Sequence, residues 1–89
     1  MKKDPNQQML IDLGQRLKMV RVSANMNQHQ MATALGISDR ALKNYEKGLR
    51  DPPSSLAVMV SRTFNIDARW LLLGADGVEP PPFVPREGN

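Results

Sequence analysis

Apolar residues recur at helical spacing along most of this chain. The first stripe occupies every third or fourth position and consists of Leu10, Leu13, Leu17, Val20 and Ala24. This spacing places side chains on one face of an α-helix. Gly14 lies on the same face, where its missing side chain permits the close approach of a neighbour. Because Asp4, Pro5 and Gln7 provide an N-cap, a proline at the first helical position and a capping box, we predict a helix from Pro5 to about Ala24.

A second, short helix is predicted from about Gln28 to Leu35. Asn27 is placed as its N-cap and Gln30 as the third residue of another capping box. Its small apolar face consists of Met31, Ala32 and Leu35. Gly36 ends this helix because a residue without a Cβ readily adopts the left-handed conformation of a helix C-terminus.

A third helix is predicted to follow after only two further residues. Ser38 can cap it, and Asp39 lies in the first turn, where the helix dipole favours an anion. Gly48 ends it after Lys47. Its inner face carries Leu42, Tyr45 and Glu46, and the opposite face carries Asp39, Arg40, Lys43, Asn44 and Lys47.

The outer face of this third helix contains the residue types that read DNA bases. Arg and Lys pair with guanine N7 and O6, Asn pairs with adenine N6 and N7, and Asp accepts from cytosine N4. A charged face is also typical of any solvated helix, and Asp39 with Lys43 has the spacing of an ordinary ion pair. The helix, glycine turn and helix in front of it favour the DNA interpretation, since so short a turn imposes the packing of a helix-turn-helix.

The pattern resembles the phage repressor and Cro-like helix-turn-helix family. The resemblance is carried by Gln28, Met31-Ala32, Leu35-Gly36-Ile37-Ser38, Leu42, Tyr45-Glu46 and Gly48. It extends from about Leu13 to Gly74. It implies an all-α, five-helix DNA-binding domain, acting as a homodimer on a two-fold symmetric operator in double-stranded DNA.

Specific roles follow for the residues of this motif. The expected base-reading residues are Asp39, Arg40, Lys43 and Asn44. The expected DNA-backbone contacts are Asn27, Gln28, Ser38, Lys47 and Arg50. Arg21 and Glu46 are each the charged member of an otherwise apolar face, so we expect them to form a partly buried ion pair, a pairing that the resemblance also implies. His29 is expected to be a solvated neighbour of these residues, without a catalytic or metal-binding role.

Two more helices and a tail complete the predicted domain. Ser54 or Ser55 is expected to cap the fourth helix, with a core stripe of Leu56, Met59, Val60, Thr63 and Phe64. Asn65 ends this helix, Ile66 fills the join, and Asp67 caps a fifth helix that runs to Gly74. We place the domain at residues 1–74 and expect the Pro-rich segment 75–89 to be extended or disordered.

The fifth helix carries four consecutive large apolar residues, Trp70, Leu71, Leu72 and Leu73. One face against a small core buries only about half of such a run. We therefore expect these four residues to form the dimer interface. The alternative is that Phe83 and Val84 fold back from the tail and cover the same patch within one chain.

Composition and charge support a polyanionic partner. The formal charge is +3, and the tail contributes −2 because it holds Asp76, Glu79 and Glu87 against Arg86, which leaves +5 on residues 1–74. An excess of basic residues suits nucleic acid. With 89 residues and no cysteine, a single small core without disulfides is expected. No apolar run approaches the length of a membrane span, and we expect a cytoplasmic protein.

The resemblance implies a transcriptional regulator, expected to be a repressor, and we expect helix 39–47 to enter the major groove. No enzyme chemistry, cofactor or metal site is expected, because the polar residues lack the spacing of a nucleophile with its base or of a ligand cluster. The main alternative is a protein-interaction module on the same fold, such as an antitoxin whose Pro-rich tail wraps its partner.

Overall fold

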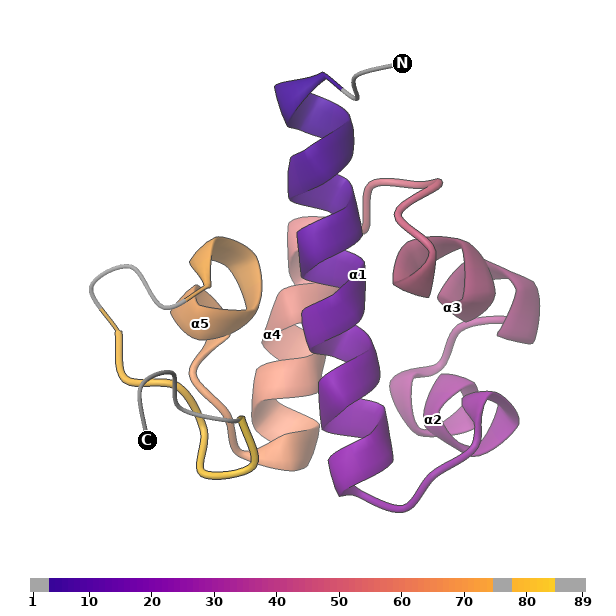
Figure 1. Ribbon diagram of the computed structural model, residues 1–89. Helices are drawn as coiled ribbons and strands as arrows, with labels where there is room; N and C mark the ends of the chain where they lie inside the picture. The colour runs from indigo at the N-terminus through magenta and orange to yellow at the C-terminus, as the bar shows by residue number, and fades with distance from the viewer. Residues whose placement is uncertain (1–3, 75–77, 85–89) are drawn as a thin grey trace.

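A long first helix organises the fold, and shorter helices pack on either side of it (Figure 1). The computed structural model describes residues 4–74 and 78–84. Its helices are α1 (Pro5–Ser23), α2 (Gln28–Leu35), α3 (Asp39–Glu46), α4 (Ser54–Phe64) and α5 (Ala68–Leu73). α1 packs against α3 on one side and α5 on the other, and α4 contacts both α2 and α5. The all-α, five-helix architecture predicted from the sequence is confirmed.

Local capping explains where the first three helices begin. The Asp4 carboxylate accepts from the Gln7 backbone N–H at 2.7 Å, and Asn27 accepts from the Gln30 N–H at 2.8 Å. Both capping boxes are closed by the reciprocal glutamine contact. The Ser38 hydroxyl accepts from the Ala41 N–H at 3.0 Å. Each cap satisfies backbone donors that the first turn of a helix leaves without a partner, and these three predictions are confirmed.

The start and the buried face of α4 differ from the prediction. Pro53 is its N-cap and makes no side-chain capping bond, so neither Ser54 nor Ser55 has the expected role. The buried positions are Leu56, Ala57 and Val60. Met59 and Thr63 are exposed and Phe64 is partly buried. The buried face of α4 is therefore rotated toward Ala57 relative to the predicted stripe. α4 packs against α2 and α5, and these contacts select the face that is buried.

The core lies where α1 meets the other helices. It is formed by Leu13, Leu17, Val20, Met31, Ala32, Leu35, Leu42, Tyr45, Leu56, Ala57, Val60, Trp70 and Leu71. The residues that join successive helices, Ile37 and Ile66, are partly buried against it, as their positions between glycine or asparagine caps and the next helix predict. None of the helices in the described residues is long and apolar enough to cross a membrane.

The tail departs from the expected extended chain. Val78 and Val84 pack against the core, and the Val84 N–H bonds to the Pro81 carbonyl at 3.0 Å. The Phe83 ring meets Trp70 edge-on, with centroids 5.9 Å apart and planes at 86°, an arrangement that aromatic pairs favour. The folded-back alternative therefore describes residues 78–84, while 75–77 and 85–89 lie outside the described residues.

Candidate nucleic-acid interface

The outward-facing helix α3 is held in place by α1. Gly14 lies so close to the end of α3 that an added Cβ would be 2.4 Å from the Tyr45 carbonyl oxygen and 2.6 Å from that of Glu46. This confirms the close approach predicted at Gly14. Leu42 and Tyr45 are buried beside it, which sets the rotation of α3 about its axis.

Arg21 and Glu46 join α1 to α3 with charge-assisted hydrogen bonds. Arg21 Nε donates to Glu46 Oε2 at 2.8 Å and Nη2 donates to Oε1 at 3.1 Å. Arg21 Nη1 also donates to the Met26 carbonyl at 3.1 Å, just before α2. Only 4% of the Glu46 side chain is exposed. One arginine thus links α1, the approach to α2, and α3.

The opposite face of α3 is open. Arg40, Lys43 and Lys47 are exposed, and Asn44 is partly buried. Among residues 4–74 and 78–84, the side chains of these four make no hydrogen bond or ion pair. Helix periodicity puts them on one side because Leu42 and Tyr45 are turned inward. The arrangement offers guanidinium, ammonium and amide donors to a ligand lying along α3.

Gln28, at the first turn of α2, is partly engaged inside the protein. Its Nε2 donates to Glu46 Oε1 at 3.2 Å, which extends the Arg21–Glu46 pair to a third helix. Its backbone N–H still belongs to the first turn, where donors lack intrahelical partners. Asn27 and Ser38 use their side-chain oxygens as caps, which leaves the Asn27 amide and the Ser38 hydroxyl hydrogen as donors.

His29 and Asp39 form a contact that the sequence analysis missed. His29 Nδ1 lies 3.0 Å from both carboxylate oxygens of Asp39. Asp39 thus pairs across to α2, and the i,i+4 pair with Lys43 is not the one formed. His29 is exposed as expected, yet it has a specific side-chain partner. No signal in the linear sequence connects residues ten positions apart on two helices.

The loop after α3 carries the two remaining predicted backbone contacts. Lys47 is the C-cap of α3. Arg50 is exposed, and its guanidinium carbon lies 6.0 Å from the centroid of the Tyr45 ring, a cation–π distance. This contact holds Arg50 beside the C-terminal end of α3. Asp51 is exposed in the same loop and places a negative charge next to Arg50.

The four residues expected at a dimer interface do not share one environment. Trp70 and Leu71 are each only 2% exposed, because both belong to the core of one chain and the Phe83 ring also contacts Trp70. Their assignment to a dimer interface is therefore corrected. Leu72 and Leu73 remain 40% and 64% exposed, and with Met9 and Arg16 they line a shallow groove between α1 and α5.

Arg16 is a further structural residue that the sequence analysis missed. Its Nε donates to the Leu71 carbonyl at 2.8 Å and its Nη2 to the Leu72 carbonyl at 3.2 Å. These carbonyls belong to the last turn of α5, which has no intrahelical donors for them. Burial lowers the pKa of Arg16 from its ordinary value, although Asp12 opposes this shift, and the group stays charged at every physiological pH.

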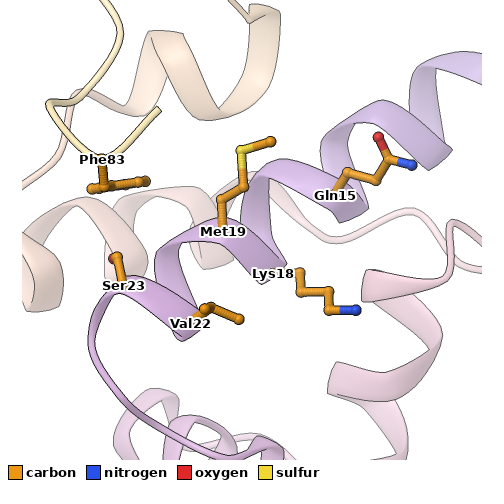
Figure 2. A pocket seen from close by; sticks show the side chains of 6 residues that line it. All are labelled: Gln15, Lys18, Met19, Val22, Ser23 and Phe83. Carbon is orange, nitrogen blue, oxygen red and sulfur yellow. The ribbon is translucent and has the colours of Figure 1, made fainter. Parts of the chain in front are cut away.

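A hollow of about 410 Å³ on the outer side of α1 carries no comparable chemistry. Figure 2 shows its lining, in which the Lys18 ammonium points away from the Phe83 ring. Met19, Val22 and Phe83 form an open, mostly apolar floor. Within the described residues, no three His, Cys, Asp or Glu side chains lie together in a way that could hold a metal ion. The face of α3 is therefore the best candidate site.

Comparison with known proteins locates the same part of the chain. A family model described as a helix-turn-helix domain matches residues 14–77. The chain is 37% identical over 68 residues to the HTH-type transcriptional regulator ImmR of Bacillus subtilis (strain 168), across 76% of this chain and 53% of that protein. It thus spans about half the length of this curated relative. No solved structure matches the chain significantly.

Proposed function

The chain belongs to the phage repressor-like helix-turn-helix family, and we propose that it regulates transcription by binding double-stranded DNA with α3 in the major groove. The observation that carries this proposal is the open face of α3. Arg40, Lys43 and Asn44 carry side chains that can bond to bases, and they project from a helix whose other face is fixed against α1. A helix fits the major groove, and a fixed helix presents its side chains in one register.

The residue roles follow from position on this surface. Arg40, Lys43 and Asn44 face outward near the middle of α3 and are assigned to base edges. Asp39 is assigned to bases as an acceptor. The backbone contacts are assigned to the helix ends and the following loop, where N–H groups and cations surround the open face; they are Asn27, Gln28, Ser38, Lys47 and Arg50.

We further propose that the protein acts as a homodimeric repressor on a two-fold symmetric operator. Leu72, Leu73 and Met9 supply exposed apolar surface along the groove between α1 and α5. Such a patch is seldom left open on a soluble monomer. A second copy related by a two-fold axis would cover it and would place two recognition helices about 34 Å apart, one turn of DNA.

The experiment that tests this function is selection of bound duplexes from a random pool, followed by a salt titration on the selected and a random duplex. We expect a palindromic consensus, and an affinity that falls linearly in log K against log salt with a slope of about −0.9 for each phosphate neutralised. An unselective pool and an affinity insensitive to salt would contradict DNA binding and favour the protein-interaction alternative.

A further inference from the structure

His29 and Asp39 connect the N-terminal turns of α2 and α3 through their side chains. The two carboxylate oxygens are both 3.0 Å from His29 Nδ1. An ionised carboxylate only accepts hydrogen bonds, so Nδ1 carries the hydrogen in this contact. The side chains are 74% and 50% exposed, on the surface that carries the predicted base readers.

The surroundings make Asp39 unusual. The other titratable side chains on α3 are Arg40, Lys43, Tyr45 and Glu46. Tyr45 and Glu46 are turned inward, and Glu46 is held by Arg21. Asp39 is thus the one carboxylate on the outward face of α3. His29 is the one ionisable side chain in α2, and it is the side chain on that helix that contacts this carboxylate.

We infer that His29 is a specificity-determining residue that acts through Asp39, an inference that rests on the proposed function. Asp39 can accept from cytosine N4 or adenine N6, but it repels the acceptor atoms of guanine and thymine. Its discrimination depends on where the carboxylate points. By donating to both oxygens, His29 fixes that direction and keeps Asp39 away from Lys43, which has the i,i+4 spacing to pair with it.

The test compares wild type with His29→Ala and His29→Asn by duplex selection and by affinity for the selected duplex and its single-base variants. His29→Asn places an amide donor close to the Nδ1 position. We expect His29→Ala to reduce the preference at one base pair by on the order of tenfold. We expect His29→Asn to keep that preference.

Two further measurements make the outcome decisive. In an Asp39→Ala background, His29→Ala should not change base preference further, since a residue that acts through Asp39 has no effect without it. Unchanged thermal midpoints are expected, because both side chains are exposed.

Equal base preference in wild type and His29→Ala would overturn the inference while leaving the proposed function intact. Failure of the wild type to select any duplex would overturn the proposed function and this inference together.

Discussion

Arg21 donates two hydrogen bonds to Glu46 across the contact between α1 and α3, over 2.8 Å and 3.1 Å. Paired geometry of this kind fixes both the distance and the orientation of the two groups. Since Gln28 donates to the same carboxylate at 3.2 Å, the pair also fixes α2 against α3. The Arg21 guanidinium on α1 thus helps to fix the angle between α2 and α3, the two helices of the helix-turn-helix.

Arg21→Met should therefore destabilise the domain strongly. It leaves the Glu46 carboxylate, 4% exposed, without its cation, and breaking a buried pair in this way costs about 3–5 kcal/mol. The measurement is urea denaturation. The matched control is the double variant Arg21→Met/Glu46→Met, which should recover much of the loss because no buried charge remains. A loss within ~0.5 kcal/mol for the single variant, as at a surface site, would contradict a structural role.

Gly14→Ala should also destabilise the domain, although alanine favours helices by about 1 kcal/mol over glycine. The new Cβ would lie 2.4 Å from a backbone carbonyl oxygen, which cannot move aside as a flexible side chain can. Overpacking of this kind costs about 1–3 kcal/mol or more. The neighbouring exposed change Gln15→Ala is the control, and its unfolding free energy should stay within ~0.5 kcal/mol of wild type. Equal midpoints for the two variants would disprove the close contact.

Base readers and backbone contacts should respond differently to alanine substitution. Arg40→Ala or Asn44→Ala should cost about 1–3 kcal/mol on the selected operator and relax the preference at one base pair. Gln28→Ala should weaken all duplexes alike, since phosphates carry no sequence information. The control is Arg62→Ala, which removes a similar charge from an exposed position of α4. The assignment fails if Asn44→Ala lowers the affinity for operator and random duplex by the same factor.

The tail and the exposed leucines of α5 should have separable roles. Phe83→Ala should shift the emission of Trp70 to longer wavelength and cost about 0.5–1.5 kcal/mol beyond lost burial, because the edge-on ring covers the indole. Leu73→Glu should convert a dimer to a monomer in sedimentation experiments and leave Trp70 emission unchanged. If the intact protein and a version ending at Asp76 are both monomers at high concentration, the dimer proposal is wrong.

The cap of α5 should weaken in acid. Asp67 accepts from the Arg69 side chain and from its backbone N–H at 2.8 Å, and these bonds lower the pKa of Asp67, the side-chain bond contributing most. Because the folded pKa lies below the unfolded value of about 3.9, the stabilisation is present above that value and is lost as pH falls through the folded pKa. NMR titration should show Asp67 titrating below an ordinary aspartate, and Arg69→Ala should raise its pKa. An unchanged pKa in that variant would contradict this cause.

Helix boundaries were predictable because short-range contacts set them. Asp4 with Gln7, Asn27 with Gln30 and Ser38 with Ala41 are each three residues apart, so the sequence itself shows the cap. The left-handed turns at Gly36 and Asn65 are likewise local, with φ of 70° and 55°. The start of α4 could not be predicted in this way, because Pro53 caps the helix without a side-chain bond. The two adjacent serines suggested a side-chain cap that does not form.

Contacts between distant segments were decided by the tertiary structure. The amphipathic pattern of α4 allowed several neighbouring stripes, and only its packing against α2 and α5 selected the one with Ala57. Phe83 covers Trp70 because residues in the segment 78–84 pack against the core, whereas the Pro-rich composition indicated an extended chain.

The outward face of α3 was predictable from helical periodicity, because Leu42 and Tyr45 had to face inward and Arg40, Lys43 and Asn44 then had to face out. The side-chain contacts that surround this face were not predictable. The contact between His29 and Asp39 joins two helices, and the bond from Arg16 to the Leu71 carbonyl spans 55 positions. Periodicity determines the direction of a side chain from its own helix axis, whereas its partner depends on the distance and angle between two helices, and these exist only once the core has packed.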